Sequence, residues 1–98
     1  MFVVIFRARV RQFDAGYSAM AARMRDLAIS QFGCLSFTAT TEGDQEIAVS
    51  YWPDETSIRL WKQHAEHLEA QQQGRDRWYA SYEVDIAEVR RSYRHPAR

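Results

Sequence analysis

Apolar residues at every second position open the chain. From Phe2 to Val10 one face is apolar throughout, and the opposite face carries Arg7 and Arg9. A period of two is typical of a β-strand with one buried face. The same period predicts three further strands over residues 34–41, 46–52 and 82–93.

Two segments between the predicted strands have helical spacing instead. The first follows Asp14, a good N-cap residue, and the second follows Asp54. Gly33 is the expected left-handed end of the first helix, and Gly74 is expected to break or end the second. The apolar stripes consist of Tyr17, Met20, Met24, Leu27 and Ala28 in the first helix, and Ile58, Trp61, Ala65 and Leu68 in the second.

The element order is therefore β-α-β-β-α-β, with a short hairpin over residues 42–45. This order predicts an α+β, ferredoxin-like fold: an antiparallel sheet with two helices on one face. The whole chain, 1–98, is expected to form one domain, with residues 94–98 as a disordered tail.

The helix-free face of that sheet is predicted to be too apolar for full exposure. Burial against a second copy is the economical solution, so we expect a homodimer. The last strand supports this, since its apolar parity shifts after Ile86 to Val89 and Tyr93, as in a strand that bulges toward a partner. The residues expected on this face are Val3, Ile5, Ser36, Thr38, Ala48, Ser50 and Trp52.

Composition excludes several classes of protein. Thirteen basic and thirteen acidic residues cancel, so nucleic acid and anionic membranes are not expected partners. No apolar run approaches the roughly 20 residues that span a bilayer, and no signal peptide is recognisable. The single cysteine, Cys34, excludes an internal disulfide. These features predict a cytoplasmic protein.

The candidate chemistry lies after the third strand. His64 and His67 could act as a general base, because the unperturbed pKa of imidazole is about 6.5. Exposed helix surface is the competing interpretation of both histidines, and a core position is that of Trp61. A metal site is not expected, because no cysteine or well-placed carboxylate completes a ligand set with the histidine pair.

A run of residues in this region carries a family resemblance. It comprises Trp61, Ala65, Glu66, His67, Ala70, Gln71, Gly74, Arg75, Trp78, Tyr79 and Tyr82, after the strand end Ser50-Tyr51-Trp52. With the strand order, these residues resemble the antibiotic biosynthesis monooxygenase family of dimeric α+β barrels, and most of all a small bacterial branch without a settled reaction. The resemblance implies a homodimer with a cavity between sheet and helices in each subunit.

Some members of that family oxygenate polycyclic phenols without metal or flavin. The resemblance therefore implies a monooxygenase that needs no cofactor and acts on a small aromatic molecule of the phenol or quinone type. It implies His67 or His64 as base and Arg75 as the group that stabilises the oxyanion. The implied substrate-binding residues are Trp61, Trp52, Tyr51, Gln71, Trp78 and Tyr79.

Other functions are open to the same fold, among them a structural or assembly role without a ligand. A non-catalytic ligand-binding or stress-related dimer would use the same cavity without turnover. Haem degradation is not expected. The branch with that activity has a histidine ten residues after the helix tryptophan and an asparagine on the first strand, whereas this chain has Gln71 and no asparagine there.

Overall fold

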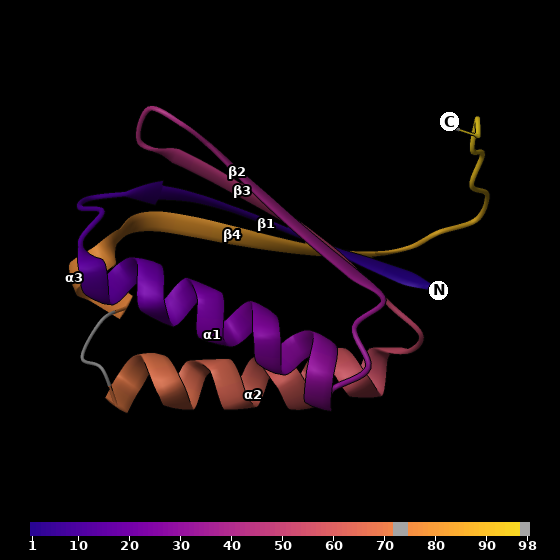
Figure 1. Ribbon diagram of the computed structural model, residues 1–98, viewed down its shortest axis with the longest axis horizontal. Helices are drawn as coiled ribbons and strands as arrows, with labels where there is room; N and C mark the ends of the chain where they lie inside the picture. The colour runs from indigo at the N-terminus through magenta and orange to yellow at the C-terminus, as the bar shows by residue number, and fades with distance from the viewer. Residues whose placement is uncertain (72–74, 97–98) are drawn as a thin grey trace.

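The computed structural model describes residues 1–71 and 75–96, and the side chains of all of these except 69–71 and 75–76. The elements are β1 (Phe2–Val10), α1 (Ala15–Gln31), β2 (Ser36–Glu42), β3 (Gln45–Trp52), α2 (Glu55–Gln71), α3 (Arg75–Trp78) and β4 (Tyr79–Glu88). The strands form one antiparallel sheet in the order β2-β3-β1-β4. Both long helices lie on the same side of it (Figure 1). The predicted ferredoxin-like α+β fold is confirmed.

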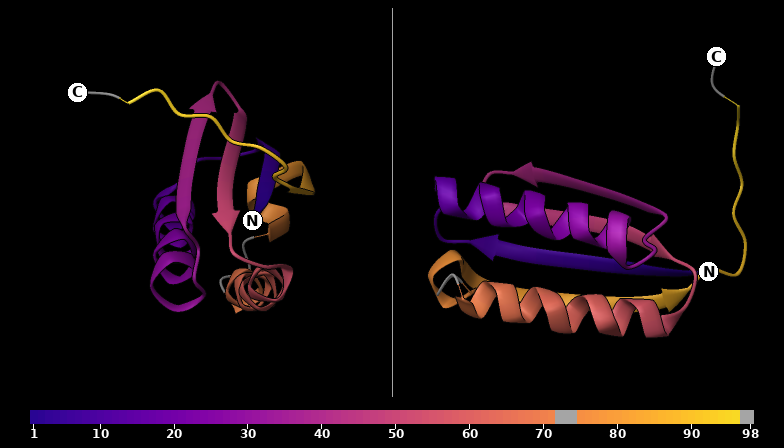
Figure 2. Two further views of the ribbon diagram at one scale, coloured as in Figure 1. Left: turned by 90° about the vertical axis from the view of Figure 1, so that its right-hand side faces the viewer. Right: turned by 60° about the horizontal axis from the view of Figure 1, so that its bottom comes forward.

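The helices divide the sheet between them. α1 runs along the β2 side of the sheet and α2 along the β4 side (Figure 2). The two helices lie side by side and run in opposite directions (Figure 1 and Figure 2). A hydrogen bond joins them where Trp61 Nε1 donates to the Met24 carbonyl at 3.0 Å.

Local chemistry explains where the helices begin and the turns form. Asp14 is the N-cap of α1, because its Oδ1 accepts from the Tyr17 amide at 2.8 Å. Gly33 follows α1 with φ +79°, a conformation that costs glycine little. Gly43 has φ +61° in the β2–β3 hairpin, and Asp54 accepts from the Ser57 amide at 2.7 Å at the start of α2. The predicted caps and the Gly33 turn are confirmed, whereas Gly74 lies outside the described residues.

The last strand differs from its prediction over residues 82–93. β4 begins three residues earlier, at Tyr79, and ends at Glu88. It ends there because its neighbour β1 begins at Phe2; the last bond joins the Val89 amide to the Met1 carbonyl at 3.0 Å. The register shift lies at the opposite end of the strand, beside Arg9 and Val10, so the predicted bulge near Val89 is wrong.

The register of β3 corrects the predicted helix-free face. Ser50 pairs with Val4, which packs in a cluster with residues of both helices, so Ser50 lies on the helix side. Ala48 and Trp52 lie on that side as well, because alternate residues of a strand share a face. The prediction was wrong for these three residues because β3 is apolar on both faces.

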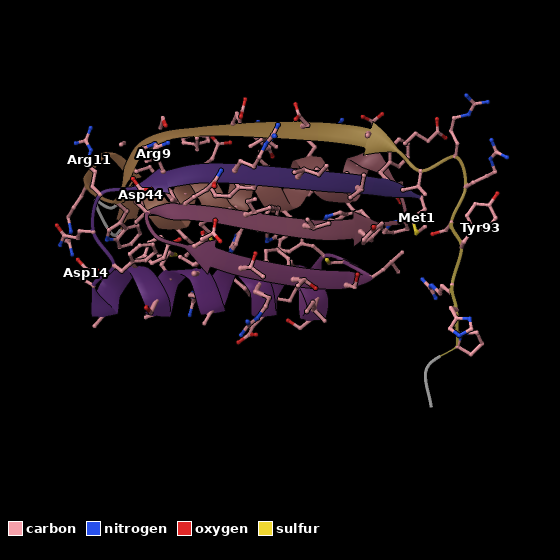
Figure 3. The ribbon with its side chains drawn as sticks, turned by 90° about the horizontal axis from the view of Figure 1, so that it is seen from above. Met1, Arg9, Arg11, Asp14, Asp44 and Tyr93 are labelled. Carbon is pink, nitrogen blue, oxygen red and sulfur yellow. The ribbon has the colours of Figure 1, made fainter. Side chains whose placement is uncertain are left out.

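The helix-free face instead combines an apolar centre with polar ends. Its apolar residues are Val3 and Ile5 of β1 with Ile47, Val49 and Tyr51 of β3, and Ser36 and Thr38 of β2 lie beside them as predicted. Figure 3 looks onto this face, with the Arg9–Asp44 ion pair of 2.9 Å at one end and Met1 and Tyr93 at the other.

The core on the helix side forms two clusters. One gathers around Tyr17 and Trp78 near the start of α1, and the other around the fully buried Trp52 near its end. The space between sheet and helices, bounded by these clusters, contains the candidate site.

Candidate functional site

A cavity of about 360 Å³ lies between the helix side of the sheet and the two long helices. This volume is within the roughly 300–1,000 Å³ typical of small-molecule sites. Its apolar lining consists of Val4, Phe6, Phe37, Ala39, Ala48, Val84 and Ile86 from the strands and Ala21, Ala22, Met24, Ile58, Trp61 and Ala65 from the helices. Its polar lining consists of Tyr17, Ser18, Arg25, Glu46, Ser50, Lys62, Glu66, Tyr79 and Tyr82.

A tyrosine and a carboxylate meet in the cavity wall. Tyr17 comes from the first turn of α1, and Glu46 is the second residue of β3. The Tyr17 hydroxyl donates a hydrogen bond to Oε2 of Glu46. Burial, and then the hydrogen bond to Glu46, raise the pKa of Tyr17 far above its ordinary value. The hydroxyl therefore stays protonated and keeps donating to the carboxylate.

Aromatic packing fixes the ring of Tyr17. Its centroid lies 5.4 Å from that of Phe13, 5.7 Å from Trp78 and 6.0 Å from Tyr79, in edge-to-face geometry each time. Such pairs are favourable because the positive edge of one ring meets the negative face of another. With a side chain only 4% exposed, Tyr17 has little freedom to move its hydroxyl away from Glu46.

Asp14 connects the start of α1 to α3 next to Tyr17. While Oδ1 caps α1, Oδ2 accepts from the Arg77 guanidinium at 2.5 Å. The Arg77 hydrogen bond, followed by the Tyr17 amide, lowers the pKa of Asp14 well below its ordinary range. Gly16 permits this approach, since a Cβ there would lie 3.5 Å from the Trp78 ring and 3.3 Å from the Asp14 carboxylate. The contact holds Trp78 against Tyr17.

The other end of the cavity is built on two tryptophans and a serine. Trp61 lines the wall, and its indole N–H bonds the Met24 carbonyl of α1. Trp52 lies behind it, with ring centroids 5.4 Å apart. The Trp52 Nε1 donates to Ser50 Oγ at 2.8 Å, so this buried hydroxyl is oriented where it borders the cavity.

The two histidines lie on the flank of α2 that does not line the cavity. Lys62 and Glu66 line it, whereas His64 is two residues from each, and residues two apart point to opposite sides of a helix. His64 is half-buried, with its ring centroid 5.5 Å from that of Phe32. His67 is exposed.

The remaining predicted residues are dispersed. Tyr79 lines the cavity, but Trp78 packs behind Tyr17 and Tyr51 lies on the helix-free face. The side chains of Gln71 and Arg75 lie outside the described residues. The structure thus brings Trp61 and Tyr79 together at one cavity, with Trp52 behind the wall, and the roles assigned from the sequence stay predictions.

Sequence reasoning missed Tyr17 and Glu46 as a pair. Tyr17 was interpreted as part of an apolar stripe, and Glu46 lies 29 residues further along the chain. Only the register of β3 with β1, which pairs Glu46 with Ala8 on the helix side, reveals that the carboxylate faces the helices.

Two classes of site find no support within the described ranges. Among residues 1–68 and 77–96, no three His, Cys, Asp or Glu side chains converge as they would around a metal ion. In the same part of the chain, no helix is both long and apolar enough to cross a membrane.

A four-stranded antiparallel sheet, two helices on one face and a cavity between the layers define a ferredoxin-like α+β fold, which solved antibiotic biosynthesis monooxygenases share. The chain superposes on an asparagine-to-alanine variant of SnoaB, a cofactor-independent oxygenase from Streptomyces nogalater, with a TM-score of 0.73 at 17% identity. The match covers 93% of this chain and 94% of SnoaB. No protein-family model matches the chain.

Two proteins are similar to this chain in sequence. YqjZ, an uncharacterized protein of Bacillus subtilis, is 41% identical over 91 residues, which are 92% of this chain and 80% of YqjZ. The Jasmonate monooxygenase ABM of Pyricularia oryzae is 30% identical over 99 residues, or 96% of this chain, but the chain spans only 46% of that protein. The chain is thus a sequence relative of YqjZ, and it has the fold of solved antibiotic biosynthesis monooxygenases.

Proposed function

We propose that this protein is a cofactor-independent monooxygenase that acts on a small, flat, mostly apolar molecule with a phenolic or enolic hydroxyl. The observation that carries the proposal is the cavity: apolar over most of its lining, large enough for a bicyclic or tricyclic ring system, and provided with ionisable groups in its wall. SnoaB, which has the same fold, is a cofactor-independent oxygenase, and a relative of this chain is a jasmonate monooxygenase.

The proposed oxygenation needs few groups from the protein. An electron-rich anion, formed when the substrate loses its acidic proton, reacts directly with oxygen. In an anthrone-type ring, a CH₂ carbon becomes a carbonyl while one O₂ is consumed and one water is released. The protein contributes by orienting the ring, excluding water and removing the proton.

The site roles inferred from the sequence belong to this proposal. Trp61 and Tyr79 would contact the ring directly, with Trp52 supporting Trp61 from behind. His64 or His67, as the base, would have to act from outside the wall that Lys62 and Glu66 form. Arg75 as the group that stabilises the anion remains part of the proposal.

We also propose that the protein works as a homodimer through the helix-free face. Val3, Ile5, Ile47, Val49 and Tyr51 form its centre and are only half-buried in the single chain. A two-fold interface would bury this patch on both copies at once. Such pairing would close two sheets into a barrel and support each cavity from behind.

Oxygen uptake tests the activity. Purified protein, treated with a chelator and free of flavin by its absorption spectrum, is mixed with anthrone and a panel of simple phenols in air-saturated buffer. We expect oxygen consumption and, with ¹⁸O₂, one labelled oxygen in the product. The Ala48→Phe variant, whose new ring would fill the cavity, is expected to lose turnover. Binding without oxygen uptake across the panel would instead indicate a ligand-binding protein.

A further inference from the structure

The carboxylate of Glu46 is unusual among the acidic groups of the described chain. Several other carboxylates of the described chain form ion pairs on exposed surface, such as Asp85 with Arg7 at 3.0 Å and Asp44 with Arg9 at 2.9 Å, and the partly buried Asp14 pairs with Arg77. Glu46 lies in the cavity wall, and none of the described cations lies within 4 Å of its carboxylate, although Arg25 and Lys62 line the same cavity.

One carboxylate oxygen of Glu46 accepts a hydrogen bond within the described chain, and the other does not. Oε2 accepts from the Tyr17 hydroxyl, while no hydrogen bond within residues 1–68 and 77–96 engages Oε1. A carboxylate has about four acceptor sites on its two oxygens, so this group can accept a further proton donor. A partly dehydrated carboxylate without a counter-ion gains most from a ligand that brings an O–H or N–H group.

Tyr17 fixes the position of the Glu46 carboxylate. Its ring is held by Phe13, Trp78 and Tyr79, and its buried hydroxyl can reach the carboxylate without rearrangement. A hydrogen bond to a charged acceptor is shorter and stronger than a neutral one. The Tyr17 hydroxyl thereby holds the carboxylate of Glu46 in place in the cavity wall.

We propose that Glu46 is the proton acceptor of this cavity and that Tyr17 is its positioning residue, so the substrate class is an apolar ring system with an acidic phenolic or enolic hydroxyl at the Tyr17–Glu46 end. The inference rests on the proposed monooxygenase function and assigns proton removal to Glu46 in place of His64 or His67, neither of which lines the cavity. It replaces no role of Trp61, which lies toward the opposite end of the cavity with Ser50.

The proton transfer balances as follows. The bond that breaks is the substrate O–H bond or, in anthrone, a C–H bond of the CH₂ group, which gives the same kind of anion. The electron pair stays on the substrate, and the proton goes to Oε1 of Glu46. Oxygen then adds to the ring carbon, and Glu46 returns the proton to the peroxide. That return restores the carboxylate. The remaining hydrogen on that carbon then leaves as a proton while the O–O bond breaks, so the distal OH group and this proton depart as water and the carbonyl remains.

An anaerobic titration separates proton removal from oxygenation. Wild-type protein is mixed with anthrone without oxygen, and the absorption of the anthrone anion is followed. We expect the wild type to ionise bound anthrone at neutral pH, and Glu46→Gln to bind it within about threefold of wild-type affinity but leave it neutral. In air, kcat/KM of Glu46→Gln should fall about 100-fold or more, the usual weight of a general base.

Companion variants distinguish chemistry from folding. Tyr17→Phe keeps the ring and should lower kcat about tenfold with KM nearly unchanged, since only the hydrogen bond to the carboxylate is lost. Glu46→Asp keeps the charge on a shorter side chain and should recover part of the anion signal. Glu42→Gln and Tyr93→Phe, on exposed residues outside the cavity, are matched controls expected to behave as wild type.

The two proposals fail in different ways. If wild type neither binds nor oxygenates any compound of the phenol panel, the monooxygenase function is wrong and this inference with it. If wild type turns over and Glu46→Gln, folded by circular dichroism, keeps its rate and its anion spectrum, only the assignment of Glu46 is overturned. A Glu46→Gln variant that unfolds is replaced by Glu46→Ala, which also removes the carboxylate, and an unchanged rate and spectrum in that variant would likewise overturn the assignment.

Discussion

The two stacked tryptophans provide the sharpest test of where the ligand lies. Trp61 lines the cavity and bonds Met24 of α1, whereas Trp52 is fully buried behind it and bonds Ser50. Replacing each by phenylalanine removes one N–H donor and one ring of the indole. Trp52→Phe should therefore lose more stability, whereas Trp61→Phe should lose more affinity for the ligand.

The stability costs follow from burial. Trp61→Phe loses one hydrogen bond, worth about 0.5–1.5 kcal/mol, and roughly 1 kcal/mol of partly buried ring area. The Met24 carbonyl lies within α1 and keeps its helical partner, so no further cost arises. The total is about 1.5–2.5 kcal/mol, or roughly 6–20 °C in Tm for a domain of this size.

Trp52→Phe should cost more. It leaves the Ser50 hydroxyl, only 3% exposed, without its donor, at about 1–3 kcal/mol. The lost ring also leaves a void in the core, so the total reaches about 3–5 kcal/mol. Because Trp52 does not line the cavity, its replacement should change ligand affinity little.

Thermal melts at one fixed protein concentration measure the stabilities, and anaerobic calorimetry with anthrone measures the affinities. We expect Trp61→Phe to weaken anthrone binding at least about fivefold, and Trp52→Phe to stay within about twofold. Leu60→Ala, on the exposed side of α2, is the control and should change stability by less than about 0.5 kcal/mol. Weaker binding in Trp52→Phe with none in Trp61→Phe would refute the placement of the ligand.

Three further predictions follow from the described contacts. Gly33→Ala should destabilise the fold by about 1–2 kcal/mol in denaturant titrations, because φ is +79° there; an unchanged midpoint would contradict the left-handed turn. The hydrogen bond from Arg77 lowers the pKa of Asp14 in the folded state below its ordinary value of 3.8. The contribution of the Asp14 carboxylate to stability is therefore present above about pH 3.8 and is lost as the pH falls below that value. Asp14→Asn keeps a capping side chain, so its melting temperature should depend less on pH between 5 and 2 than that of wild type, and identical acid profiles would count against the ion pair. Val49→Glu should convert dimers to monomers in sedimentation velocity at micromolar concentration, and a monomeric wild type would remove the proposed interface.

Local signals in the sequence were enough to predict the fold. The cap at Asp14, the turn at Gly33 and the alternation in β1 each depend on neighbouring residues, and each was placed correctly. β4 was placed less well, because its start depends on pairing with Val10 and its end on where β1 begins. Both ends of β4 are thus set by pairing with a strand far away in the sequence, which a local sequence pattern does not reveal.

The site was harder to predict for the same reason. Alternation shows that Glu46 and Ser50 share one face of β3, but not which face, because the other face is equally apolar. The choice is made by pairing with Val4 of β1 and by the helices above it. On α2 the histidines drew attention by their chemistry, whereas the spacing from Lys62 to Glu66 decides which flank borders the cavity.

The cavity exists because small side chains border it. Both helices and both strands of the β2–β3 hairpin present alanine to the space, at Ala21, Ala22, Ala39, Ala48 and Ala65. Leucine at any of these positions would add apolar burial, about 0.8 kcal/mol for each buried CH₂ group. A chain selected for stability alone would close such a gap and would not leave beside it a carboxylate that has no cation within 4 Å among the described residues. The open space and Glu46 together favour a ligand that has an apolar body and an acidic proton. The anaerobic anthrone titration tests both properties, because it measures binding of the ring system and loss of its proton in one experiment.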